Sequence, residues 1–231
     1  MAQDSRHEES DDDLMLSSAA LAALQDFMKD KALAEQKLTS LKEDTVYEID
    51  IVDFIEDWQL SQFWYDVTTR NTLANESIQE TFDNARIGCV SSPSVFVTLK
   101  KMGLSNRSIT VFEFDKRFNV YGDEFVFFDF NEPLTLDEKN GERPLKGMFD
   151  FLIIDPPFLS EECLLKTAQT VRWLAKPTCK ILICTGKVQT ARIKAQLECI
   201  ETDFLPLHQN GLQNEFRSFI NYSSKTLKRK E

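Results

Sequence analysis

Short apolar runs alternate with segments of helical periodicity through the centre of the chain. Runs rich in β-branched and aromatic residues predict strands at 86–91, 108–115, 125–130, 149–154 and 179–184. Between them, apolar positions recur at helical spacing and predict a helix from Pro93, a second at 160–175 and a third near 187–198. Strands that alternate with helices predict an α/β fold with a Rossmann-like, doubly wound, mostly parallel sheet.

Two more strand-like runs lie near the carboxyl end, at 200–207 and 215–222. The Asn210-Gly211 pair between them is typical of a tight turn, so the runs predict a hairpin. Such a hairpin would add an antiparallel edge to the sheet, because consecutive hairpin strands run in opposite directions.

The amino-terminal pattern is different. Residues 1–16 contain many acidic and few apolar side chains, which predicts a disordered tail. Leu21, Leu24 and Met28 then recur at helical spacing, and this helix either docks a partner or packs on its own domain. A polar linker is predicted at 34–46. The chain is thus predicted to divide into an acidic tail, a helical extension, an α/β domain and a basic tail, at 1–16, 17–57, 58–224 and 225–231.

The run at 149–154 is followed by residues that can bind a ligand. Its nearly continuous apolar character predicts a strand buried on both faces, and Asp155-Pro156-Pro157-Phe158 follows directly. Ligands bind at the carboxyl ends of such strands. The carboxylate of Asp155 and the carbonyl of Pro156 can both accept hydrogen bonds from an amino group, while the Phe158 ring can cover a flat base or a lysine stem. The alternative is that Asp-Pro-Pro serves only as a turn.

Acidic residues also end the second and third predicted strands. The carboxylate of Glu113 or of Asp115 can accept hydrogen bonds from both hydroxyls of a ribose. Asp129 and Phe130 are placed to meet the amino group and the face of an adenine. The first turn, at 90–94, contains no glycine, which disfavours the pyrophosphate of NAD or FAD. S-adenosylmethionine has no phosphate and is compatible with this serine-rich turn.

A block of aromatic residues precedes the α/β pattern. Trp58 is followed closely by the consecutive residues Phe63, Trp64 and Tyr65, and a helix is predicted at 68–82. Three large neighbouring rings are more than one face of an amphipathic helix can bury. Some of them are therefore predicted to line a pocket or an interface, and burial of all of them in the core is the alternative.

The charge balance bears on the class of partner. The formal net charge is −11, and the only basic cluster comprises Lys225, Lys228, Arg229 and Lys230. A protein that grips a nucleic-acid backbone normally presents a basic face, so nucleic acid is disfavoured and a basic protein or a small molecule is favoured.

Cysteine and histidine content excludes further classes. The five cysteines are odd in number and form no Cys-x-x-Cys motif, which predicts reduced thiols in a cytoplasmic or nuclear protein. The two histidines, His7 and His208, are too few to favour a histidine metal site, so no metal is predicted. They also disfavour a Ser-His-Asp triad. No apolar run is long enough for a membrane span, and the first residues do not resemble a signal peptide.

Several segments of the chain resemble the elongation factor 1-alpha lysine methyltransferases, a family first described as N6-adenine-specific DNA methyltransferases. The resemblance extends over roughly residues 15–222 and is carried by 58–65, 90–95, 112–118, 155–163 and 214–217. The pair of Gln62-Phe63-Trp64-Tyr65 with Asp155-Pro156-Pro157-Phe158 is specific to it. Asp-Pro-Pro-Phe alone also occurs in adenine and glutamine methyltransferases and indicates only methylation of a nitrogen. The family more often has tyrosine at Phe158, a difference that retains stacking and removes a hydroxyl.

The resemblance implies a seven-stranded class I methyltransferase that uses S-adenosylmethionine to methylate a lysine of translation elongation factor 1-alpha. The protein is also predicted to be a cytoplasmic monomer. Asp155, Pro156 and Phe158 would hold the target amine. The cofactor residues would be Ser91, Glu113, Asp129 and Phe130, with Val90, Ser92 and Asp115 beside them. Glu113 is preferred over Asp115 because it lies inside the strand end. Substrate contacts would come from Trp58, Gln62, Phe63, Trp64, Tyr65 and Pro157.

Three classes of function remain open from the residues themselves. A lysine methyltransferase agrees with the charge balance, but it must remove a proton from an amine with a pKa near 10.4. An adenine methyltransferase acts on an amine that is already neutral, but it needs a positive groove that the sequence does not show. A module with the fold and no cofactor is the third class.

Overall fold

A seven-stranded mixed sheet forms the centre of the computed structural model, which describes residues 17–40, 49–136, 145–212 and 214–230. The strand order is β3-β2-β1-β4-β5-β7-β6, and β7 runs antiparallel to both of its neighbours. The bounds are β1 Arg86–Val90, β2 Ser108–Glu113, β3 Phe125–Phe127, β4 Phe149–Ile154, β5 Ala175–Gly186, β6 Ile200–Glu201 and β7 Phe216–Ile220. This sheet confirms the predicted Rossmann-like, doubly wound fold with an antiparallel closing strand.

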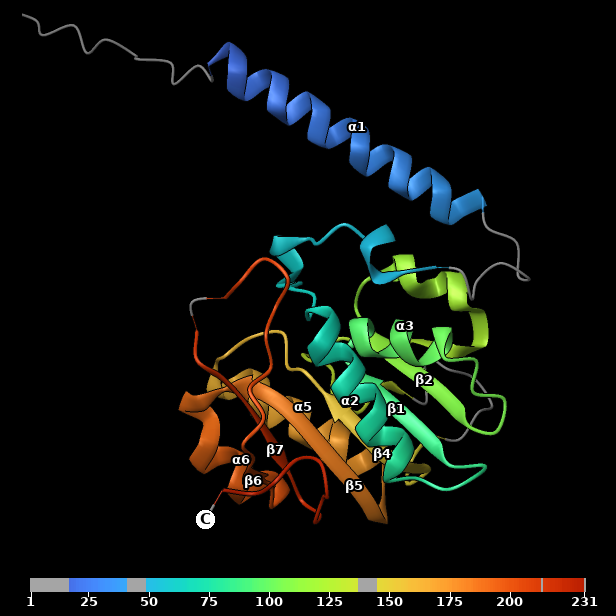
Figure 1. The fold of residues 1–231 in the computed structure, drawn as a ribbon, viewed down its shortest axis with the longest axis vertical. Coiled ribbons are helices and arrows are strands. Elements are labelled where there is room, and N and C mark those ends of the chain that lie inside the picture. The colour runs from blue at the N-terminus through green and yellow to red at the C-terminus, as the bar shows by residue number, and fades with distance from the viewer. Residues whose placement is uncertain (1–16, 41–48, 137–144, 213, 231) are drawn as a thin grey trace, which may run out of the picture.

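Helices cover both faces of the sheet (Figure 1). The α-helices are α1 Ser18–Ser40, α2 Val67–Gln79, α3 Pro93–Lys101, α5 Glu161–Leu174 and α6 Thr190–Leu197. Shorter 3-10 turns are η2 Ile51–Asp53, η3 Trp58–Leu60, η4 Lys116–Glu124 and η5 Lys187–Gln189. The core between the sheet and α2 and α3 is separate from the core between the sheet and α5 and α6.

Strand β4 contributes side chains to both cores. Phe151 and Ile153 pack on one side, whereas Leu152 and Ile154 pack on the other, and all four are almost inaccessible to solvent. Each fully buried side chain of this kind stabilises the fold by about 1.5–3 kcal/mol. The continuous apolar run therefore reflects a strand that is covered on both faces, as the sequence predicted.

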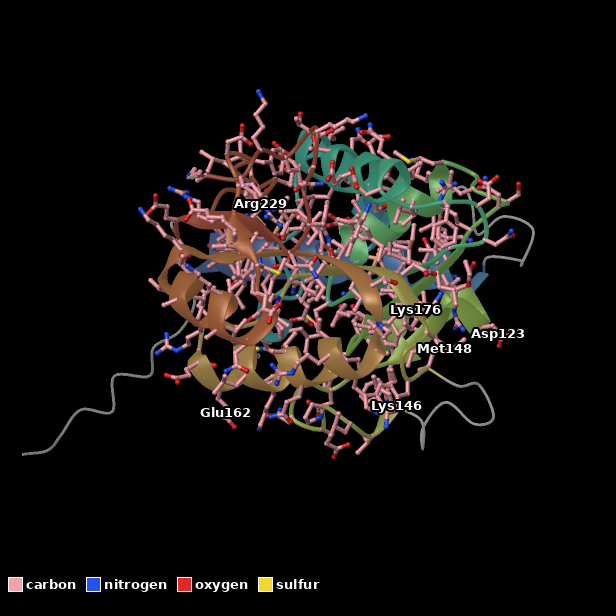
Figure 2. The ribbon with its side chains drawn as sticks, turned by 90° about the horizontal axis from the view of Figure 1, so that it is seen from below. Asp123, Lys146, Met148, Glu162, Lys176 and Arg229 are labelled. Carbon is pink, nitrogen blue, oxygen red and sulfur yellow. The ribbon has the colours of Figure 1, made fainter. Side chains whose placement is uncertain are left out.

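Helix α5 extends along the sheet from the carboxyl end of β4 to the opposite edge. Ser160 caps its amino end, because the Ser160 Oγ accepts a hydrogen bond from the Cys163 amide at 3.2 Å. Figure 2 shows Glu162 in the first turn of α5 and Lys176 just beyond its last turn, at the other end of this helix. The turn that precedes α5 is thereby held at the ligand-binding edge of the sheet.

The segment before α2 belongs to the sheet-and-helix core. Ile49, Ile51 and Phe54 are buried in the same cluster as the side chains of α2 and α3, and the Phe54 ring stacks on Phe118 at 4.1 Å. The residues directly ahead of the aromatic block are therefore anchored on the domain.

The ends of the chain differ from the predicted pattern in two places. Helix α1 continues to Ser40, through part of the predicted linker at 34–46. Strand β6 has only two residues where a strand over 200–207 was predicted, and the long segment between β6 and β7 replaces the predicted tight hairpin. Pro206 lies within that segment and cannot donate to a strand ladder.

The remaining predictions concern the two tails, the linker and membrane spans. The acidic tail at 1–16 and the linker residues after Ser40 lie outside the described residues. In the basic tail, Lys230 forms an ion pair with Glu201 at 2.5 Å, and Arg229 pairs with Thr202 in a β-bridge. Among the described helices, none combines the length and the apolar character needed to cross a membrane.

Candidate active site

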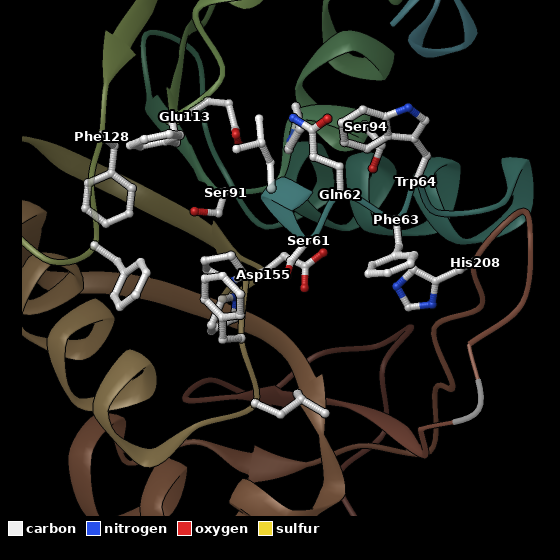
Figure 3. A pocket seen from close by; sticks show the side chains of 18 of the residues that line it. Ser61, Gln62, Phe63, Trp64, Ser91, Ser94, Glu113, Phe128, Asp155 and His208 are labelled. Atoms are coloured by element: carbon white, nitrogen blue, oxygen red, sulfur yellow. The ribbon is translucent and has the colours of Figure 1, made fainter. Parts of the chain in front are cut away.

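A pocket of about 580 Å³ opens at the carboxyl ends of β1, β2, β3 and β4. Figure 3 shows Asp155 in the middle of the view, with Ser91, Glu113 and Phe128 on one side and Phe63 and His208 on the other. The lining comes from the turns after these strands, from the aromatic block and from the segment before β7. We call the side with Glu113 the donor half and the side with His208 the acceptor half; these two names do not refer to hydrogen bonds.

The turn after β1 forms one wall of the donor half. Ser91 has a φ angle of 49°, in the left-handed region where glycine is usual, and its amide donates to the carbonyl of Phe112 at 2.8 Å. Pro93 is the first residue of α3, and the buried hydroxyl of Ser92 has no hydrogen-bond partner in the described part of the chain. A serine therefore provides the tight turn that a glycine provides in dinucleotide-binding folds, while the Ser91 amide is already engaged.

Glu113, the last residue of β2, lines the donor half with only 7% of its surface exposed. The Asp115 amide donates a hydrogen bond to the Glu113 Oε1 at 3.3 Å. Burial is the main cause that raises the pKa of Glu113 to about 7; the Asp115 carboxylate also raises it, whereas the Asp115 and Phe114 amides and the Arg117 charge lower it. In the described residues no lysine or arginine forms an ion pair with this carboxyl group. It is thus a buried acceptor with room for external donors.

Asp115 is occupied by a different network. Arg117 forms an ion pair with its carboxylate at 2.6 Å, and the Gln62 amide nitrogen donates to it at 2.8 Å. Arg117 also donates to the side-chain oxygen of Gln62 at 3.0 Å and to the carbonyl of Ile55 at 3.0 Å. Burial opposes ionisation, yet these hydrogen bonds hold the pKa of Asp115 below its usual value. The network, which we call the Arg117 brace, fastens the aromatic block to the end of β2.

The residues after β3 complete the donor half. Phe128, Asp129 and Phe130 all line the pocket, and the Asp129 Oδ1 accepts a hydrogen bond from the Asn131 amide at 2.8 Å. The Phe130 ring lies 5.6 Å from the Phe158 ring, so the two halves meet at an aromatic contact.

Asp155 lies between the two halves. Its amide donates to the carbonyl of Val90 at 3.0 Å, which fixes the backbone directly before the two prolines. Burial raises the pKa of Asp155 to about 8, with the Tyr65 hydroxyl lowering it and the Glu113 carboxylate raising it. The ionised form of this carboxyl group is a strong proton acceptor, because no neighbouring cation among the described residues stabilises it.

Aromatic rings enclose the acceptor half. Phe63, Trp64, Phe158, His208 and Phe216 line it, and the His208 ring packs at 4.8 Å from that of Phe216. Burial lowers the pKa of His208 to about 4, so its imidazole is neutral near pH 7. Neutral rings can surround an alkylammonium group without repelling it.

The acceptor half is assembled from two distant segments. Tyr65 and His208 form an antiparallel β-bridge, and the Gln209 amide donates to the carbonyl of Trp64 at 2.9 Å. Glu56 joins the same segments, because it accepts from the Trp64 amide at 2.7 Å and from the Asn210 side chain at 2.9 Å. We call this arrangement the 65–208 junction.

The structure brings most of the predicted site residues to one pocket. Those in the lining are Gln62, Phe63, Trp64, Ser91, Glu113, Asp129, Phe130, Asp155, Pro156, Pro157 and Phe158. Val90, Ser92, Asp115 and Tyr65 are buried and do not line it, and Trp58 is 72% exposed outside it. Sequence reasoning did not find Phe128, His208 or Phe216. No short motif marks His208, although it is the only histidine in the described part of the chain.

Comparison with known proteins assigns the chain to a family. The family model described as "Probable N6-adenine methyltransferase" matches residues 56–224. An EEF1A lysine methyltransferase 1 from Gallus gallus is 44% identical, with coverage of 94% of this chain and 98% of that protein. The Homo sapiens protein of the same name is 46% identical over 94% of this chain and 95% of its own length. A protein-lysine N-methyltransferase from Dictyostelium discoideum is 41% identical over 94% and 95% of the two chains.

The two kinds of name differ in the nitrogen that is methylated, adenine in one and lysine in the other. Both describe N-methyltransferases, as the Asp-Pro-Pro-Phe turn indicated. Because the identity extends over nearly the whole length of curated relatives, the chain belongs to the family of the EEF1A lysine methyltransferases.

Proposed function

We propose that this protein transfers a methyl group from S-adenosylmethionine to a lysine side chain of translation elongation factor 1-alpha. The observation that carries the proposal is the position of Asp155, in one pocket between a buried carboxylate and a neutral aromatic enclosure. The names of the relatives support a lysine nitrogen, and two of them support EEF1A as the substrate.

The donor half fits a nucleoside without phosphates. Glu113 offers an acceptor for ribose hydroxyls that no cation occupies, whereas the carboxylate of Asp115 is held in the Arg117 brace. Asp129 and Phe130 line the same half and would meet the adenine. The Ser91 amide is not free to receive a pyrophosphate, because its N–H is bound to the carbonyl of Phe112. S-adenosylmethionine, when bound, supplies an electrophilic methyl group on a sulfonium.

The acceptor half fits an alkyl amine. The Asp155 carboxylate and the Pro156 carbonyl would accept hydrogen bonds from the nitrogen, and the rings of Phe63, Trp64 and Phe158 would cover the lysine stem. Substrate orientation is the main task of these residues, since methyl transfer requires an in-line approach of the nitrogen lone pair.

Burial also helps to remove the proton from the lysine. A desolvated ammonium loses its proton more easily than one in water, while the desolvated Asp155 has a pKa raised to about 8. The two effects act in the same direction, so the Asp155 carboxylate is placed to accept the proton that the lysine must release. His208 is a weaker acceptor, because burial lowers its pKa to about 4.

An adenine in nucleic acid is the second candidate substrate, and the description of the matching family model favours it. The net charge of −11 argues against it, because a nucleic-acid backbone is bound through a basic surface. The protein is also proposed to act in the cytoplasm as a monomer. Its five cysteines are all buried and unpaired, as suits a reducing compartment.

A transfer assay tests the proposal. Purified protein is incubated with methyl-labelled S-adenosylmethionine and either recombinant EEF1A or adenine-containing DNA and RNA oligonucleotides. Label should enter EEF1A, and mass spectrometry should place it on a lysine. Label in the oligonucleotides with none in EEF1A would overturn the proposal.

A further inference from the structure

Tyr65 lies directly behind the acceptor half and is completely buried. The 65–208 junction fixes its backbone, and the His208 ring packs against the Tyr65 ring at 4.9 Å between centroids. The next residue, Asp66, donates its amide to the carbonyl of Leu207 at 2.9 Å. These contacts fix the position of the Tyr65 ring, but the ring does not line the pocket.

The hydroxyl of Tyr65 is unusual for a buried polar group. By distance and angle it makes no hydrogen bond in the described part of the chain, yet it lies near enough to the Asp155 carboxyl group to lower its pKa. Its ionisable neighbours are the carboxyl group of Asp155, at the end of β4, and the thiol of Cys184, in β5. An unpaired buried hydroxyl costs about 1–3 kcal/mol, so such groups are retained where a partner is available in some state of the protein.

Asp155 has few other groups to orient it. Its pocket-facing carboxyl group is affected by Tyr65, by Glu113 from β2 and by Cys184 from β5. Glu113 repels the ionised form, and a buried thiol is only a weak donor. Tyr65 is thus the one strong hydrogen-bond donor among these neighbours.

We propose that Tyr65 is a positioning residue whose buried hydroxyl donates to one oxygen of the Asp155 carboxylate and leaves the other oxygen for the substrate amine. This inference rests on the proposed function, since it assigns an amine to Asp155. The hydrogen bond would form with the ionised carboxylate, which is an acceptor only, and would be weaker with the protonated acid. It would therefore favour the form of Asp155 that receives the lysine proton.

The chain offers a matched control for this hydroxyl. Tyr121, in η4, is 6% exposed, its hydroxyl also lacks a hydrogen-bond partner in the described residues, and its ring packs edge-on against Phe96 at 4.8 Å. Tyr121 does not line the pocket. Tyr65→Phe and Tyr121→Phe thus remove the same atom from similar surroundings, one beside Asp155 and one away from it.

The test compares the wild-type protein with these two variants. Cofactor affinity, measured by calorimetry, should agree within about twofold in all three. In the transfer assay on EEF1A, kcat should fall about tenfold in Tyr65→Phe, the loss expected for a hydrogen bond to a charged group, with KM for EEF1A nearly unchanged. Tyr121→Phe should keep the wild-type kcat.

A second measurement needs no catalysis. The carboxyl carbon of Asp155 is titrated by ¹³C NMR in each protein. Its midpoint should move to higher pH in Tyr65→Phe, since a donor to the ionised form is lost, and should stay in place in Tyr121→Phe. In the wild type, the Tyr65 ring carbon that bears the hydroxyl should follow the Asp155 titration, a signal that does not depend on how well a variant folds.

The outcomes separate this inference from the proposed function. If the wild-type protein labels EEF1A and the two variants match it in kcat and in the Asp155 midpoint, the positioning role is wrong. If the Tyr65 signal does not follow Asp155 in the wild type, the role is also wrong. If the wild type fails to label EEF1A but Tyr65→Phe moves the Asp155 midpoint, the contact is real and the assigned substrate is wrong.

Discussion

Replacement of Glu113 by alanine tests the donor half most directly. Glu113 ends β2, lines the pocket with 7% of its surface exposed, and has no ion-pair partner among the described residues. Glu113→Ala removes a carboxylate that takes no part in the side-chain contacts of the Arg117 brace, which link Gln62, Asp115 and Arg117. Its effect on ligand binding can therefore be separated from an effect on folding.

The expected magnitude follows from two terms. Loss of hydrogen bonds between a carboxylate and two ribose hydroxyls costs roughly 1.5–3 kcal/mol for a charged acceptor. The pKa of Glu113 is about 7, so near pH 7 about half of the groups must lose a proton before they bind, which reduces the net effect by about 0.4 kcal/mol. We expect a net loss of about 1–3 kcal/mol, or roughly a 5- to 150-fold rise in the Kd for S-adenosylmethionine.

Calorimetry at pH 7.5 measures this change, with Asp115→Ala as the comparison. Asp115→Ala should leave Arg117 without its carboxylate and lower the free energy of unfolding by about 2 kcal/mol, with a smaller effect on affinity where the protein remains folded. Unchanged affinity in Glu113→Ala together with a large loss in Asp115→Ala would refute the reasoning and assign the ribose to Asp115.

Three further predictions follow from the same geometry. Asp155→Ala should abolish methyl transfer to EEF1A and leave the calorimetric Kd for the cofactor within about fivefold, because it holds the amine; a larger loss of cofactor affinity would contradict its placement. The wild-type affinity for the cofactor should rise between pH 6 and pH 8, since the pKa of Glu113 is raised to about 7 and ribose hydroxyls favour the ionised form, whereas Glu113→Gln should give a flat profile in the same titration. Gly88→Ala should lower the free energy of unfolding in urea by about 1–3 kcal/mol, because its Cβ would lie 2.7 Å from the Leu152 side chain and 3.0 Å from that of Phe149; an unchanged urea midpoint would show that these side chains can move aside.

Strands β1, β2, β4 and β5 were predictable because each contains an apolar run with side chains buried on both faces of the sheet. The length of β3 was not, since the chain leaves the ladder after Phe127, although the Phe128 amide still donates to the carbonyl of Glu113 at 3.0 Å. The run at 200–207 leaves the ladder after Glu201. It crosses to the first turn of α2, where the Leu207 amide donates to the Thr69 hydroxyl at 2.9 Å. Such a contact depends on tertiary structure and has no local signal.

The same distinction applies to the site. The carboxyl ends of the strands could be located from the sequence, and Glu113, Asp129 and Asp155 do line one pocket. The different surroundings of Glu113 and Asp115 could not be read from strand position alone. The available signal was Arg117, two residues after Asp115, because a nearby guanidinium selects the carboxylate that it can reach. His208 enters the pocket only through the 65–208 junction.

The 65–208 junction has a consequence for biosynthesis. Glu56 and Asn210, which close it, are separated by 154 positions in the chain. While the ribosome is still adding the last strands, a nascent chain already contains the whole donor half and lacks one wall of the acceptor half. Contacts of such long range form late and slow the final stage of folding. The unfinished enzyme should therefore be able to bind its methyl donor before it can accept a lysine.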